Sequence, residues 1–174
     1  VSILSGVTSL IMILPTFLDL KTHGEKLTSV DRLFTEKTWF LDIFAKNFIG
    51  SFDTTKYGSI PMIYVGIVPL LLAILFFTLK SIKFHVKLSY FFLIIIFIAS
   101  FSLERLDLFW QGMHAPNMFL HRYSWLFSLF IIFLAAETLQ RLKQIKFKNL
   151  IISFTILSIG FILVFVFRKH YDFL

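Results

Sequence analysis

Residues 59–79 read SIPMIYVGIVPLLLAILFFTL and contain no charged side chain. A helix needs about 20 apolar residues to cross the ~30 Å hydrocarbon core of a bilayer. Comparable apolar stretches recur along the chain, so the predicted membrane spans are about 1–18, 59–79, 88–103, 119–139 and 149–167. The sequence therefore predicts an all-α protein, a polytopic transmembrane helix bundle of about five spans in which residues 1–174 form part of one membrane domain.

The composition excludes a soluble globular protein. Hydrophobic residues make up 57% and charged residues 16% of the chain, whereas soluble domains have roughly 45–50% apolar and about 25% charged residues. A soluble fold of this length could not hide 24 Phe residues, so the expected partner of this surface is the lipid bilayer. The lack of cysteine excludes disulfides and thiol catalysis within this stretch. Because Val1 starts inside an apolar run, we expect the chain to be an internal piece of a longer protein.

The stretch 88–103 is the shortest of the predicted internal spans. It would reach the length of a crossing helix if it continued through Leu106–Trp110. If it instead entered and left the membrane on the same side, the direction of every later span would be inverted. The residues alone leave both alternatives open.

The basic residues that set the net charge of +7 are concentrated in two short connections. Lys80–Lys87 contains three Lys and Arg141–Lys148 contains four basic residues, without an acid in either, and the other 10 basic residues (17 minus 7) balance 10 acidic ones. Short loops rich in Lys and Arg stay cytoplasmic. Loops 80–87 and 140–148 are therefore predicted to be cytoplasmic in a multi-pass cell-membrane protein, and loops 19–58 and 104–118 extracytoplasmic. This orientation accounts for the net charge of +7, so no nucleic-acid partner is predicted.

The outer loop 19–58 has an apolar pattern of its own. Large apolar side chains recur there at roughly helical intervals, at Leu33, Phe34, Trp39, Phe40, Phe44 and Phe48. The pattern predicts either an interfacial helix lying along the outer surface of the membrane or a loop folded onto the helix bundle. Beyond this loop, Pro61 is expected in the first turn of its span, and Pro69 is expected to kink the middle of that span.

The stretch Glu104–Tyr123, ERLDLFWQGMHAPNMFLHRY, carries many more polar and titratable groups than a connection between two spans requires. Several have ordinary explanations. Trp110 and Tyr123 fit an aromatic belt at the membrane interface, and residues 104–107 fit a solvated helix end with a local ion pair. The stretch contains none of the common motifs of soluble nucleotide-binding enzymes, serine hydrolases or zinc proteases.

Two titratable residues lie two to three positions inside the predicted span 119–139, namely His121 and Arg122. Arg122 could simply reach back to the lipid headgroups, or it could place a cation at phosphate depth in the outer leaflet, where it would hold a lipid phosphate. Glu137 is expected to be structural, because Arg141 is four residues later and can pair with it. His114 and His121 lack a third ligand at suitable spacing, so no metal site is predicted.

Three stretches resemble a known family. FWQGMHAPNMFLHRYSWLFS (109–128), GSFDTTKYGSIPMIYVGIVPLLLAILFF (50–77) and LAAETLQRL (134–142) are similar to the YfhO family of bacterial multi-pass membrane proteins, and the similarity runs from about Leu14 onward. Members of that family look like GT-C-type glycosyltransferases. The resemblance implies part of an enzyme that moves a sugar from a polyprenyl-phosphate carrier to a cell-envelope polymer, such as lipoteichoic acid, at the outer face. It implies no cofactor beyond this donor substrate.

The resemblance also implies roles for individual residues. The residues expected at the lipid phosphate are Arg122, His121 and His114. The residues expected at the sugar or the acceptor are Trp110, Gln111, Asn117, Asp107, Asp53, Lys56 and Tyr57. No catalytic residue is assigned, because the catalytic carboxylate of GT-C enzymes typically lies in a first large outer loop that this piece is expected to follow. A lipid-linked sugar transporter or flippase, and a non-catalytic membrane scaffold, are the alternative functions.

Overall fold

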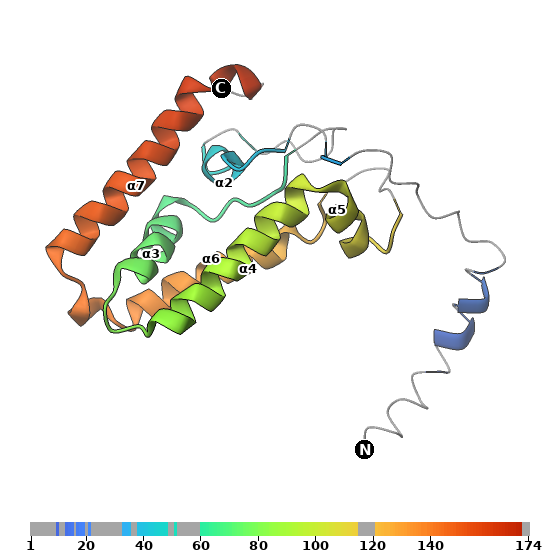
Figure 1. Ribbon diagram of the computed structural model, residues 1–174, viewed down its shortest axis with the longest axis horizontal. Coiled ribbons are helices and arrows are strands. Elements are labelled where there is room, and N and C mark those ends of the chain that lie inside the picture. Colours follow the sequence, from blue (N-terminus) through green and yellow to red (C-terminus); the bar gives the residue numbers. More distant parts are fainter. Residues whose placement is uncertain are drawn as a thin grey trace.

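The computed structural model describes residues 10, 13–15, 17–19, 21, 33–35, 38–48, 51, 60–114 and 121–171 (Figure 1). Within these ranges the chain is helical apart from loops and one isolated backbone bridge between Phe34 and Leu103. The helices are α2 (Asp42–Ala45), α3 (Ile67–Thr78), α4 (Phe84–Ser102), α5 (Glu104–Trp110), α6 (Ser124–Leu139) and α7 (Phe147–Val166). Short 3-10 turns follow α6 at Leu142–Gln144 and α7 at Arg168–His170. The all-α prediction is confirmed.

Within the described residues, two helices are long and apolar enough to cross a membrane. These are α4, with 19 residues, and α7, with 20. The apolar helices α3 and α6 are shorter, with 12 and 16 residues, so α3 by itself covers about 18 Å at 1.5 Å per residue. The first predicted span, 1–18, lies mostly outside the described residues.

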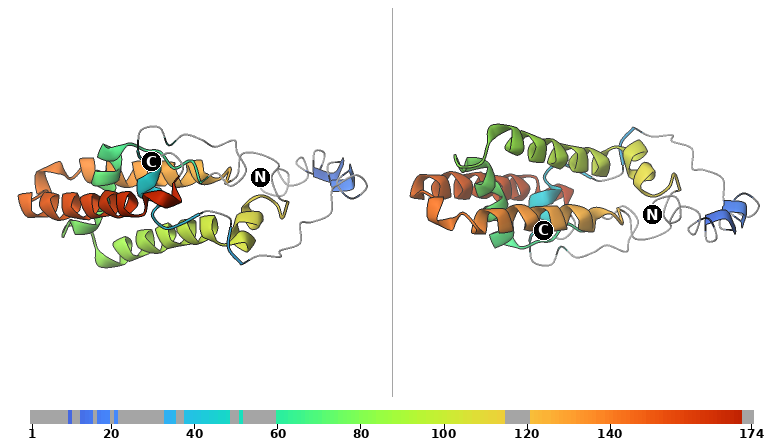
Figure 2. Two further views of the ribbon diagram at one scale, coloured as in Figure 1. Left: turned by 90° about the horizontal axis from the view of Figure 1, so that it is seen from above. Right: turned by 90° about the horizontal axis from the view of Figure 1, so that it is seen from below.

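The loops after α3 and after α6 lie at the same end of the bundle (Figures 1 and 2). We call this the basic end, because residues 79–83 and 140–146 carry most of the basic residues of the two Lys- and Arg-rich connections. Helices α4 and α7 begin there, and α3 and α6 end there. Both basic loops therefore lie at one end of the bundle, and their predicted cytoplasmic side stays a prediction.

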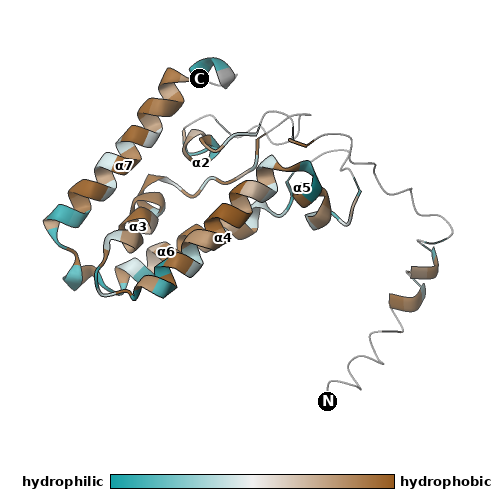
Figure 3. Ribbon diagram, in the orientation of Figure 1, coloured by the Kyte–Doolittle hydropathy of each residue, from teal (hydrophilic) through white to brown (hydrophobic). Residues whose placement is uncertain are grey.

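The core lies where α3 packs against α6 and α7. Its largest fully buried side chains include Phe76, Phe127 and Leu134. The outward faces are just as apolar, since α4 and α7 expose rows of Phe, Ile and Leu along their length (Figure 3). Exposed apolar area of this extent is unfavourable in water by about 25 cal/mol per Å², whereas hydrocarbon accepts it. The helix faces are therefore suited to lipid contact.

The predicted span 59–79 is only partly helical, which corrects the expectation for its prolines. Residues 60–66 form no helix, and α3 begins at Ile67. Pro61 therefore lies in this non-helical segment, and Pro69 lies in the first turn of α3, where its missing N–H requires no partner. No mid-helix kink results.

Asn47, in the turn that follows α2, forms hydrogen bonds with the backbone of this non-helical segment. Asn47 Oδ1 accepts hydrogen bonds from the backbone N–H groups of Val65 (3.1 Å) and Gly66 (2.9 Å). Its Nδ2 donates to the carbonyl of Ile43 (2.7 Å). Backbone groups away from water are costly to leave unpaired, so Asn47 makes the non-helical start of this segment possible.

The described part of the outer loop folds onto the bundle. The short helix α2 packs against α7, with Leu41 and Ala45 buried against Val164 and Tyr171. Phe44 lies directly over Gly160 of α7, so closely that an added Cβ atom would meet its ring at 2.6 Å. Of the two alternatives for this loop, folding onto the bundle holds for residues 38–48.

Candidate functional site

The site is built around a break between two helices. Helix α4 ends at Ser102, and α5 begins at Glu104 after the extended Leu103. The predicted continuation of the 88–103 stretch toward Trp110 therefore exists as a separate helix and not as one straight span.

The outer loop closes this break by backbone pairing. The N–H of Thr35 donates to the carbonyl of Ser102 (3.0 Å), and the N–H of Glu104 donates to the carbonyl of Leu33 (3.3 Å). Hydroxyl groups of Thr35 and Thr38 also donate to the carbonyl of Phe101, at 2.6 and 2.9 Å.

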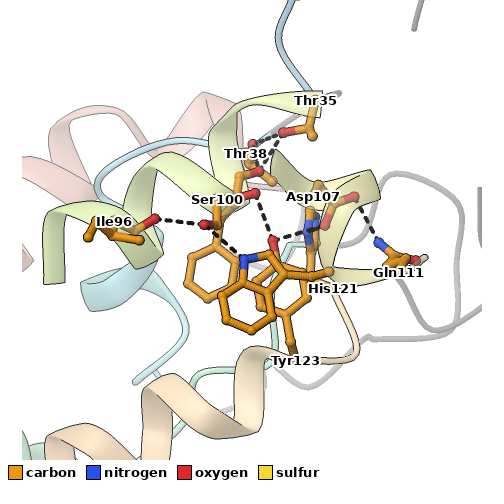
Figure 4. A network of polar contacts seen from close by, with 10 residues as sticks. Thr35, Thr38, Ile96, Ser100, Asp107, Gln111, His121 and Tyr123 are labelled. Atoms are coloured by element: carbon orange, nitrogen blue, oxygen red, sulfur yellow. Dashed lines mark hydrogen bonds and ion pairs between the residues drawn. The ribbon is translucent and has the colours of Figure 1, made fainter. Parts of the chain in front are cut away.

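A buried carboxylate, Asp107 of α5, lies at the centre of the site (Figure 4). Its Oδ1 accepts from the Tyr123 hydroxyl (2.9 Å) and pairs with His121 Nδ1 (2.7 Å), and its Oδ2 accepts from Gln111 Nε2 (2.9 Å). Asp107 is 7% exposed and His121 is 3% exposed. A buried carboxylate needs such donors, because desolvation would otherwise make its charge unfavourable.

Aromatic rings hold Tyr123 in place. Its ring stacks between Trp110 (centroids 5.2 Å apart) and Phe101 (5.4 Å). The Tyr123 hydroxyl also contacts the carbonyl of Ser100 (2.7 Å), and Trp110 Nε1 donates to Ser100 Oγ (3.1 Å). Tyr123 therefore joins the end of α4, helix α5 and the start of α6 into one polar and aromatic cluster.

The backbone at His121 is in the left-handed region, with φ of 55°. This conformation is uncommon for a residue other than glycine and persists where the surrounding structure imposes it. It occurs directly before α6, at the residue whose ring reaches Asp107. Strain of this kind is frequent at functional sites.

The Asp107–His121 pair has a defined chemical capability. An ionised Asp107 accepts the Nδ1 proton and fixes the tautomer and orientation of the ring, and Nε2 is then the remaining nitrogen. Within the part of the chain that the structure describes, Nε2 forms no hydrogen bond. The imidazole can therefore accept a proton at Nε2, or donate one to an anionic oxygen when it is protonated.

Comparison with known proteins assigns the chain to a family. The whole chain, residues 1–174, matches the family described as bacterial membrane protein YfhO. The chain belongs to the YfhO family. No curated protein and no solved structure matches it. Membership confirms the resemblance found in the sequence and identifies the apolar helix faces as those of a membrane protein.

In this YfhO-family chain the predicted site residues fall into three groups. Asp107, His121, Gln111 and Trp110 are brought together in the cluster. Arg122 is adjacent to His121 and exposed, and His114 is half-buried. The remaining predicted residues lie outside the described ranges, namely Asn117, Asp53, Lys56 and Tyr57.

The structure qualifies what Asp107 can do. A carboxylate offers about four lone-pair positions, and three protein donors already occupy Asp107. Its predicted contact with sugar hydroxyls stays a prediction, whereas its orienting contact with His121 is observed. Residues 104–107 are thus not simply a solvated helix end.

The sequence does not show the roles of two members of the cluster. Its pattern predicts Tyr123 in an interfacial belt and gives no role to Ser100, although a polar residue in an apolar span is a usable signal. At the basic end, the predicted pairing of Glu137 with Arg141 is confirmed by a hydrogen-bonded ion pair. Arg141 also donates to the Glu137 carbonyl (2.7 Å).

Proposed function

We propose that this protein is part of an integral membrane glycosyltransferase, which moves a sugar from a polyprenyl-phosphate carrier to a cell-envelope polymer such as lipoteichoic acid. The observation that carries the proposal is the buried Asp107–His121 pair directly beside the exposed Arg122. It lies at the end of α4 remote from the basic end (Figure 1), where a lipid-anchored donor could approach from one leaflet.

The proposed membrane arrangement is multi-pass, with about five crossings and the basic end in the cytoplasm. Lys- and Arg-rich short loops favour the cytoplasmic side, which puts the Asp107 cluster at the outer face. Residues 60–66 precede the roughly 18 Å of α3 without forming a helix, and a non-helical chain can cover up to about 3.3 Å per residue. Together they have the length to complete a crossing.

The chemistry of the donor explains the proposed roles. When the bond between the sugar's anomeric carbon and the phosphate oxygen breaks, the polyprenyl phosphate leaves with added negative charge. Arg122 and a protonated His121 Nε2 would stabilise that charge, since charge-assisted hydrogen bonds to phosphate are strong. Asp107 would hold the His121 ring in place, and the face of Trp110, which is partly exposed, would stack on the sugar. No residue of this chain is assigned as the base that activates the acceptor.

The test is a transfer assay with the purified protein, the polyprenyl-phosphate sugar and the acceptor polymer in detergent. We expect Arg122→Ala to lower transfer by at least about 100-fold, in line with the loss of one charge-stabilising group. Arg105→Ala is the matched control, because Arg105 is exposed on α5 and outside the cluster. It should keep transfer within about twofold. Full activity of a correctly inserted Arg122→Ala protein would overturn the assignment.

A transporter of lipid-linked sugars is the second candidate, favoured by the non-helical segment 60–66 before α3. Interrupted helices within the membrane are common at the binding sites of transporters. The same purified protein distinguishes the two functions. An enzyme transfers sugar in detergent, whereas a flippase shows activity only across a sealed bilayer.

A further inference from the structure

A second polar site lies at the basic end, far from the Asp107 cluster. It is a pocket of about 800 Å³ between the loop after α3 and the start of α7. Its polar lining includes Lys80, Ser81, Gln144, Lys146, Lys148 and Asn149. None of the lining residues is acidic, and three of them are lysines.

The local helix geometry strengthens the positive potential of this pocket. Lys146 is the N-cap residue of α7, Lys148 lies in its first turn, and that turn contains no acidic residue. A helix N-terminus carries a partial positive charge and normally favours acidic side chains. Within the described residues, the three pocket lysines form no ion pair with a carboxylate. An anion in the pocket would supply the missing counter-charge.

The edge of the pocket is apolar. Ile152 of α7 contributes to the lining, Ile151 beside it is exposed, and Phe147, between two of the lysines, is 76% exposed. This row continues into the lipid-facing surface of α7. A ligand with a charged head and hydrocarbon chains matches both parts, whereas a soluble anion matches only the first.

We propose that this pocket binds the phosphate of an anionic phospholipid headgroup from the leaflet at the basic end, with the acyl chains lying along α7. The preference of basic loops for the cytoplasm explains how many lysines are there. That preference does not explain why lysines from the loop after α3 and from the start of α7 line the same pocket, together with residues that carry hydroxyl and amide groups. Basic pockets between membrane helices on this side bind acidic headgroups. The proposal is independent of the glycosyltransferase function.

The test is a lipid titration of the purified protein in neutral detergent, followed by native mass spectrometry. Phosphatidylglycerol, phosphatidylcholine and soluble glycerol phosphate are compared. We expect one phosphatidylglycerol to bind at least about tenfold more tightly than phosphatidylcholine, and glycerol phosphate to bind much more weakly than the intact lipid.

Two variants with the same change in charge locate the site. Lys80→Gln/Lys148→Gln removes one pocket lysine from each loop, and Lys83→Gln/Lys143→Gln removes one exposed lysine from each loop outside the pocket lining. The first should weaken phosphatidylglycerol binding by about tenfold or more, and the second by less than threefold. If Lys80→Gln/Lys148→Gln fails to fold, Lys148→Gln alone is measured against Lys143→Gln.

Three results would overturn the proposal. Equal losses in the two double variants would show a diffuse attraction to basic loops. Equal binding of phosphatidylcholine would show that the headgroup charge is not recognised. Equally tight binding of glycerol phosphate would identify a site for a soluble phosphate.

Discussion

His121 and Asp107, 14 residues apart in the chain, meet through Nδ1 and Oδ1 at 2.7 Å in a nearly solvent-free contact. The contact exists because the helix breaks at Leu103 and α5 buries Asp107 and Leu108 in its middle. The contact joins two stretches that the sequence pattern assigns to different segments, since Asp107 is predicted in a helix end and His121 at the start of a span.

The Tyr123 hydroxyl should be the most sensitive single atom of this cluster. Tyr123→Phe keeps the stacked ring but removes the hydroxyl whose single proton is shared by the Ser100 carbonyl and Asp107 Oδ1. Loss of a partner from a buried polar group costs about 1–3 kcal/mol, and for a chain of this size 1 kcal/mol lowers Tm by roughly 2–4 °C. Thermal unfolding in detergent, followed by tryptophan fluorescence, measures this. Tyr64→Phe is the control, since Tyr64 is exposed, and an equal Tm for both variants would contradict the prediction.

We expect Asn47 to stabilise the non-helical segment before α3. Asn47→Ala leaves the N–H groups of Val65 and Gly66 without their acceptor, at a cost of about 1–3 kcal/mol for each group. We expect a Tm lowered by several degrees and faster proteolysis of residues 60–66. The exposed Gln140→Ala loses an amide of similar chemistry on the surface and should change Tm little. A stable Asn47→Ala protein would mean that other groups satisfy this backbone.

Docking of α2 on α7 depends on the missing side chain of Gly160. Gly160→Ala places a methyl group against the Phe44 ring, and overpacking of this kind costs about 1–3 kcal/mol. The double variant Gly160→Ala/Phe44→Leu should recover part of the lost Tm, because the smaller side chain leaves room. If the loss of Tm in the double variant equals the sum of the losses in the two single variants, the two residues are not coupled.

The proposed sidedness can be tested by labelling, because the chain has no cysteine. Single cysteines at Lys83, His114 and Lys146 are treated with a membrane-impermeant maleimide on intact cells. The distribution of basic loops predicts labelling at His114 only, and labelling at the other two positions only after permeabilisation. The reverse pattern would move the Asp107 cluster to the cytoplasmic face and remove the outer-face assignment.

Hydropathy alone places the long helices well. The stretches 88–103 and 149–167 correspond to α4 and α7 within a few residues, because a continuous apolar run of that length has few other stable conformations in a membrane. The same reasoning fails at 59–79. There the deciding partner, Asn47, comes from another part of the chain, and no local pattern shows that it accepts from Val65 and Gly66.

The candidate site likewise has features that the sequence predicts and features that it does not. Its residue types are visible in Glu104–Tyr123, because so many polar groups in a short connection need an explanation. Their pairing is not visible, since it depends on the left-handed backbone at His121 and on the break at Leu103. The sequence pattern predicts Tyr123 in an interfacial aromatic belt and does not show its contact with Ser100.

The backbone bridge between Phe34 and Leu103 also limits where the protein can be modified for experiments. Epitope tags and fluorescent reporters are usually inserted into long external loops, and 19–58 would be an obvious choice. An insertion between Leu33 and Thr38 would pull on the strand-like contact that holds the start of α5, and Asp107 lies only four residues beyond Leu103. A tag at that position would therefore perturb the cluster from a distance, and a loss of activity is expected even where the tagged protein is expressed and localised normally.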